Sequence, residues 1–189
     1  MKLNAKMINV SLCANPSLEK LVTLNNIGLS DSAKTCQIIS GWNNKADGVV
    51  NCDIDPETYK PDPNDPYYIR GSIQLGTIND LLDQDYFMMK MDIEGHEPVA
   101  LSKQASSVYF NKHSIKYMVT ESHQNTQRAG YLKQLANLGY ALRPVDYGYS
   151  GSHMVENGAL IDVDNSNTYE SYGMIDVFCE KLDPSSGVD

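Results

Sequence analysis

The stretch "MKMDIEGHEPVALSKQ", residues 89–104, places a cluster of ionisable side chains directly after an apolar run. The run, "YFMMKM" (86–91), predicts a buried central strand. Gly95 permits a tight turn inside the cluster, and Pro98 suits the first turn of a following helix. The stretch therefore predicts a strand, an acidic turn and a helix. The cluster consists of Lys90, Asp92, Glu94, His96 and Glu97.

Regular elements continue toward the C-terminus. "IKYMVTE" predicts a second buried strand, and "TQRAGYLKQLANLGY" predicts a helix capped by Gly139. Strand, helix, strand, helix and strand from 86 to 145 predict an α/β fold with a parallel sheet. "GALIDVD" (158–164) and "GMIDVFCEK" (173–181) predict closing strands, and "DYGYSGS" (146–152) predicts a loop. The apolar face of the helix consists of Tyr131, Leu132, Leu135 and Leu138.

The N-terminal half is less regular. Apolar residues at helical spacing predict an amphipathic helix over 2–14, and β-prone composition predicts strands over 21–29, 34–40 and 68–76. "TINDLLDQ" predicts a short helix with Thr77 as its cap. The irregular connection from Gly41 to Tyr67 is long enough to be functional or mobile. We expect it to shape the binding site for a substrate.

Composition and charge narrow the class of protein. The chain has 189 residues, 41% of them hydrophobic, and a formal net charge of −9. This charge repels nucleic-acid phosphates and anionic membrane surfaces, so we expect neither as a partner. No run approaches the roughly 18 apolar residues of a membrane span, and the N-terminus is a poor signal peptide. Four cysteines without paired spacing suggest unpaired thiols and a cytoplasmic location; they are Cys13, Cys36, Cys52 and Cys179.

Polar residues follow two neighbouring strands of the predicted parallel sheet. The turn from Asp92 to Glu97 ends one strand, and Glu121 and His123 end the next. Ligands bind outside the carboxyl ends of such strands, so both groups would meet at one rim. Each residue also has a structural explanation, since Glu97 could cap a helix and His96 could lie on the surface. Their joint position at strand ends favours a functional site.

These residues resemble the signature of FkbM-type methyltransferases, K-I-D-V-E-G-x-E-x-x-x-L. "MKMDIEGHEPVAL" matches it at six positions, with Ile93 in place of the valine. Four further segments are similar to the family in the same order: "VTLNNIGLSD", "TINDLL", "IKYMVTESH" and "LKQLANLGYAL". The resemblance covers residues 3–145 and implies one domain over 1–189. The six matching residues are Lys90, Asp92, Glu94, Gly95, Glu97 and Leu101.

The resemblance implies a Rossmann-like class I methyltransferase fold that binds S-adenosylmethionine. The acceptor would be an oxygen or nitrogen of a small molecule or sugar. The family's Gly-rich cofactor loop has no counterpart in this sequence, and residues 2–14 resemble the helix after its second strand. We therefore expect an N-terminally truncated sheet without its first two strands, and weak or absent binding of S-adenosylmethionine. Apolar strands left without central neighbours would also promote self-association.

The resemblance also implies roles for particular residues. The candidate catalytic residues are Asp92, Glu94, Glu121 and His123, and the candidate cofactor-binding residues are Leu29, Ser30, Asp31 and Asp92. The chain would be either an active methyltransferase or an inactive fragment of one. A non-catalytic binding module that keeps the fold is the main alternative. A metal-dependent hydrolase is a further one, with Asp92, Glu94, His96, Glu121 and His123 as ligands. From the sequence we expect no bound metal.

Overall fold

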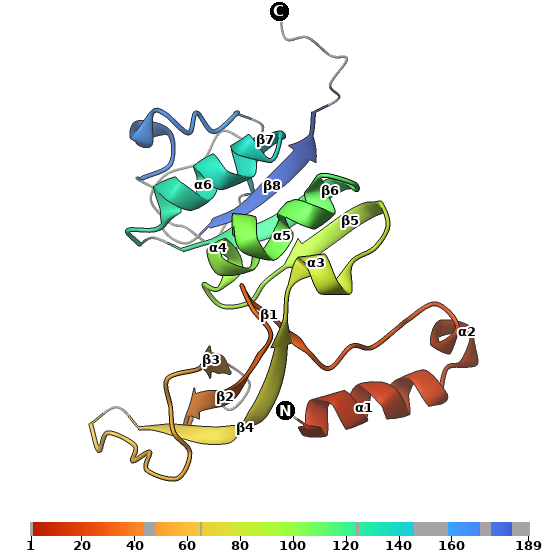
Figure 1. Cartoon of the computed structure of the whole chain (residues 1–189), viewed down its shortest axis with the longest axis vertical. Coiled ribbons are helices and arrows are strands. Elements are labelled where there is room, and N and C mark those ends of the chain that lie inside the picture. The colour runs from red at the N-terminus through yellow and green to blue at the C-terminus, as the bar shows by residue number, and fades with distance from the viewer. Residues whose placement is uncertain are drawn as a thin grey trace, which may run out of the picture. The chain divides into compact units, whose positions relative to one another are not determined.

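The computed structural model describes residues 2–43, 48–64, 66–123, 125–145, 159–170 and 175–182 (Figure 1). These residues form a mixed α/β structure with two four-stranded sheets. It divides into two compact units, each formed by two separate segments. Unit 1 contains Met1–Gly28 and Ser32–Gly76, and unit 2 contains Leu29–Asp31 and Thr77–Asp189. No helix among the described residues is both long enough and apolar enough to cross a membrane.

Unit 1 begins with two helices, α1 (Lys2–Cys13) and α2 (Pro16–Glu19). Its sheet has the order β1-β4-β2-β3, and β2 pairs antiparallel with both β4 and β3. The strands are β1 (Gly28–Leu29), β2 (Lys34–Gly41), β3 (Val49–Asn51) and β4 (Tyr67–Gly76). The helix predicted over 2–14 and the strands predicted over 34–40 and 68–76 are confirmed.

The strand predicted over 21–29 is wrong for most of its length. Only Gly28 and Leu29 form a strand, and the residues before them are irregular. Leu21 is 80% exposed and Val22 is 44% exposed, so neither side chain gains from burial. β-Prone composition favours a strand only where a neighbouring strand and a buried face are available. Those conditions are met here at the end of the segment alone.

A disulfide between Cys36 and Cys52 links β2 to the end of β3. It corrects the prediction of four unpaired cysteines. The antiparallel register places Gln37 opposite Asn51, so the next pair outward is Cys36 and Cys52. A sequence separation of 16 residues did not reveal this contact, because strand β3 lies inside the connection predicted to be irregular. Disulfides persist in oxidising compartments, so the cytoplasmic prediction loses its premise.

Unit 2 is built on a sheet of order β5-β6-β8-β7. Strands β5 and β6 are parallel, whereas β8 lies antiparallel between β6 and β7. The parallel β5–β6 crossover was predicted correctly. The insertion of β8 beside β6 was not predicted, since strand order depends on contacts that are distant in sequence. The strands are β5 (Tyr86–Met91), β6 (Ile115–Ser122), β7 (Tyr140–Val145) and β8 (Ile175–Lys181).

The helices of unit 2 confirm most of the sequence patterns. Thr77 caps α3 by accepting a hydrogen bond from the backbone N–H of Asp80. Gly139 takes a positive φ of 82° directly after α6, as a C-terminal cap requires. The helices are α3 (Ile78–Leu81), α4 (Glu97–Ala100), α5 (Lys103–Phe110), α6 (Arg128–Asn137) and a 3-10 turn (Ser166–Thr168). Figure 1 shows α4, α5 and α6 side by side over one face of the sheet.

Two further predictions for unit 2 need correction. β5 is an edge strand among the described residues, and Phe87 and Met88 are 70% and 54% exposed, so it is not a buried central strand. An uninterrupted apolar run does not reveal which faces are covered. The described part of 158–164 is not a strand, although Ile161 N donates to Leu142 O. The predicted loop over 146–152 lies outside the described residues.

Self-association through the exposed apolar strand β5 stays a prediction.

Candidate functional site

The turn after β5 positions the acidic cluster. Glu94 and Gly95 have positive φ values of 56° and 86°, which reverse the chain before α4 begins at Glu97. Glu97 is 1% exposed, and its Oε1 accepts a hydrogen bond from Ile93 N at 2.8 Å. A Cβ added at Gly95 would meet His123 only at ordinary contact distances. Gly95 is therefore favoured by its backbone conformation and not by a lack of space.

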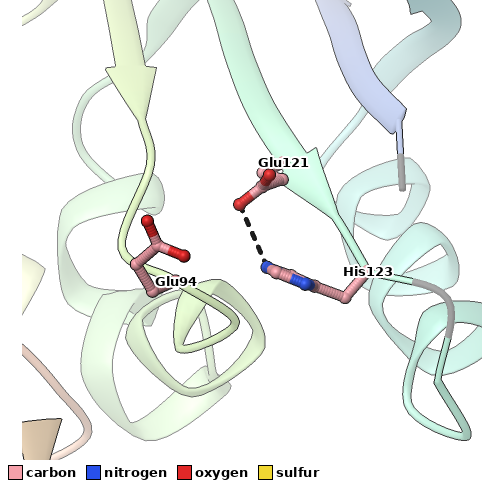
Figure 2. Close-up of side chains that lie close together, drawn as sticks. All are labelled: Glu94, Glu121 and His123. Carbon is pink, nitrogen blue, oxygen red and sulfur yellow. Dashed lines mark ion pairs between the residues drawn. The ribbon is translucent and has the colours of Figure 1, made fainter. Parts of the chain in front are cut away.

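Three of the predicted catalytic residues lie together at the carboxyl ends of β5 and β6. Ligand atoms from Glu94, Glu121 and His123 all lie within 4.8 Å of one another. Figure 2 shows Glu94 on the turn after β5 and the other two at the end of β6. His123 Nε2 is 3.0 Å from Glu121 Oε2. The two atoms do not have hydrogen-bond geometry, and within the described residues neither has another hydrogen-bond partner.

The environment raises the pKa of Glu121. Burial of the carboxylate is the main cause, and His123 opposes it. The charges of Asp92, Glu94 and Glu97 raise the pKa further. A carboxylate with a raised pKa holds a proton more readily than an ordinary glutamate. Glu121 is therefore a better proton acceptor than an ordinary glutamate.

Asp92 does not join this group. Its carboxylate lies 3.3 Å from Lys90 Nζ, and its side chain is about half exposed. Lys90 also lies 3.7 Å from Asp176 on β8, so Asp92 belongs to a solvated ion-pair network. Regular strand alternation would place Asp92 and Glu94 on one face, but the strand ends at Met91 and Glu94 has a positive φ of 56°. Asp92 contributes to the site through its charge and makes no direct contact within it.

The predicted cofactor-binding residues contact the acidic turn from an earlier segment of unit 2. Ser30 is fully buried, and its hydroxyl lies 3.2 Å from both Asp31 Oδ1 and His96 Nε2. Leu29 packs against the core. Asp31 lines an open groove of about 630 Å³ beside α4 and α6. His96 thus contacts Ser30 and does not join the proposed ligands of the hydrolase hypothesis.

A small pocket lies behind Glu121 and His123. It has about 10 Å³ of space for a water-sized sphere. Arg128, 4% exposed, also lines it and donates hydrogen bonds to the backbone carbonyls of Ser122, His123 and Tyr169. These bonds fix the end of β6. Burial lowers the pKa of the Arg128 guanidinium from its usual value.

Sequence reasoning missed Arg128, and it placed Glu97 in the acidic cluster without assigning it a role at the site. A signal for Arg128 exists in the helix pattern. It shares a face with Tyr131, Leu132 and Leu135, which are all buried. A charged residue on an apolar helix face is buried only where it has hydrogen-bond partners. The pattern could therefore have indicated a structural arginine, but not the carbonyls to which it donates.

Only part of the site fits S-adenosylmethionine. The groove beside Asp31 offers one carboxylate near Leu29, but the hydroxyl of Ser30 is already hydrogen-bonded. No glycine-rich turn follows a strand within the described residues to cradle the methionine part of the cofactor. The residues present therefore match one side of this cofactor only.

Comparisons of the chain with protein-family models, with curated proteins and with solved structures found no match.

Proposed function

We propose that the chain is a methyltransferase domain that resembles the FkbM family. It would transfer a methyl group to an oxygen or nitrogen of a small molecule or sugar. One observation carries the proposal. "LSD" and "MDIEGHE", two segments of the resemblance, are far apart in sequence but meet in unit 2 through Ser30 and His96, 3.2 Å apart. The family resemblance requires these segments to lie beside the same ligand.

The rim at the ends of β5 and β6 would take the proton from the acceptor. Methyl transfer to a hydroxyl or amine requires removal of one proton as the new bond forms. Glu121 has a raised pKa, and His123 lies next to it. The side chain of His123 is 28% exposed and that of Glu121 is 13% exposed, although His123 Nε2 and Glu121 Oε2 are themselves buried. Glu94, which is exposed, would help to orient a polar acceptor.

The donor S-adenosylmethionine would supply the methyl group. The residues present fit only one side of it. Asp31 would provide the remaining polar contact from the groove that it lines. We therefore expect donor binding to be weak, with a dissociation constant above about 100 μM, which corresponds to a binding free energy of about −5.5 kcal/mol.

Saturation-transfer NMR of S-adenosylmethionine with the full chain tests this proposal. We expect a signal from the donor that decreases when Asp31 is changed to Ala. Asp164→Ala is the control, since this exposed acid lies in another part of unit 2 and pairs with Lys133. No signal at millimolar donor, or a signal insensitive to Asp31→Ala, would refute the proposal. Low-micromolar binding would instead refute the inference that the donor site is incomplete.

A further inference from the structure

The spacing of Glu121 and His123 suits a shared ion. Glu121 Oε2 and His123 Nε2 are 3.0 Å apart without the geometry of a hydrogen bond. Two ligand atoms at about 2.1 Å from a metal lie about 3.0 Å apart at an octahedral right angle and about 3.4 Å apart at the tetrahedral angle of Zn²⁺. A hydrogen-bonded ion pair would direct one atom at the other. Here both atoms instead lack a hydrogen-bond partner within the described residues.

An independent observation comes from Glu97. Its side chain is 1% exposed, and its Oε2 has no hydrogen-bond partner among the described residues, although Oε1 is satisfied by Ile93 N. Glu97 lines the same small pocket as Glu121 and His123. A buried carboxylate oxygen without a partner is costly. A cation in front of the pocket, with its bound water, would offset that cost.

The charges around the pocket also favour a cation. Asp92, Glu94 and Glu97 all act on Glu121, and all are acids. Lys90 is close to Asp92 and Asp176. Arg128 lines the pocket as well, but the bonds described above direct its three guanidinium nitrogens to backbone carbonyls. Negative charge therefore accumulates at the ends of β5 and β6.

We propose that Glu94, Glu121 and His123 bind one divalent transition-metal cation, and that Glu97 stabilises it from the pocket behind. One imidazole and two carboxylates suit Mn²⁺ or Zn²⁺. Three protein ligands leave coordination positions open for water or for an oxygen of a small molecule. This inference revises the expectation that no metal is bound. It does not depend on methyl transfer, and with an ion bound Glu121 and His123 would hold the ion instead of taking a proton from the acceptor.

Cation binding is measured on the full chain without donor or acceptor. After dialysis against EDTA, the chain is titrated with Zn²⁺ by calorimetry and with Mn²⁺ by electron paramagnetic resonance of the free ion. We expect one equivalent of at least one ion to bind. Glu121→Gln and His123→Ala should each weaken binding by at least about tenfold. Glu94→Gln should have a similar effect, and because Glu94 is exposed this variant should fold normally.

Asp92→Asn is the matched control. It removes the same charge as Glu121→Gln from the end of the neighbouring strand, but Asp92 lies outside the ligand group. We expect the Asp92→Asn variant to bind the ion with an affinity within about threefold of that of the unchanged chain, because exposed charges are screened by salt. Equal weakening by Asp92→Asn and Glu94→Gln would indicate general attraction and overturn the proposal. The proposal would also be overturned if neither ion bound with a dissociation constant below about 1 mM, which corresponds to a binding free energy of about −4.1 kcal/mol.

Discussion

The two units of the chain are stabilised by different means. In unit 1 only a few side chains are buried, among them Cys36, Ile38 and Leu75, and a disulfide joins two of its strands. Unit 2 contains every residue of the large hydrophobic cluster that includes Leu132, Leu135 and Met118. A covalent link can thus stabilise a sheet in which few apolar side chains are buried.

The largest expected effect is on unit 2. Leu132 has 0% exposure, so Leu132→Ala should lower the free energy of unfolding by about 2–5 kcal/mol. The cost combines lost burial with the cavity that remains. Urea unfolding followed by far-UV circular dichroism measures it. Leu21→Ala is the control from unit 1, where the side chain is 80% exposed and the change should be below about 0.5 kcal/mol.

Reduction of the Cys36–Cys52 disulfide should destabilise unit 1 by about 3 kcal/mol, as expected for a loop of this length. Trp42 is the single tryptophan and stacks edge-on with Tyr68 in unit 1, so its fluorescence reports this unit. We expect the fluorescence transition to shift to lower urea after reduction, and in Cys36→Ser. The stability of unit 2, measured by hydrogen exchange of its core amides, should not change. A shift of equal size in both units would contradict the separation described here.

A smaller effect is expected at alkaline pH in unit 2. Burial raises the pKa of Cys179 from 9.0 to about 12. The unfolded thiol therefore loses its proton first, so this contribution to stability is fully present below pH 9.0 and is lost as the pH rises to about 12. Unfolding measured at increasing pH should show the decrease. Cys179→Ala should make the free energy of unfolding fall less steeply with pH. Some decrease should remain, because burial also raises the pKa of Tyr109 to about 12.

The smallest expected change in stability is at the rim. Asp92 is half exposed and paired with a solvated lysine, so Asp92→Ala should change the free energy of unfolding by less than about 1 kcal/mol. Glu121→Ala should behave similarly because its loss relieves crowding among acids. Glu121→Ala should abolish any methyl transfer, measured with radiolabelled donor, whereas Asp92→Ala should retain it because Asp92 lies outside the group. Unfolding of Asp92→Ala would show that the residue is structural.

Local patterns predicted α1, β2 and β4 in unit 1 and most elements of unit 2, but not strand β3. The spacing of Tyr131, Leu132 and Leu135 predicted the buried face of α6, because helical periodicity is encoded within a few residues. The grouping of Glu94, Glu121 and His123 at one rim followed from the positions of two strand ends. The disulfide and the place of β8 depend on pairing between distant segments. The separation of Asp92 from the group depends on side-chain direction, which spacing alone did not reveal.

The order of segments along the chain has a consequence for limited digestion by proteases. The chain passes between the units three times, after Gly28, after Asp31 and after Gly76. A single cut in the segment from Ser32 to Gly76 therefore leaves both fragments with residues of unit 1. Because Leu29–Asp31 belongs to unit 2, a fragment that began at Thr77 would lack the buried Ser30 and its contact with His96. A nicked chain can thus stay associated where a chain of two consecutive domains would separate into halves.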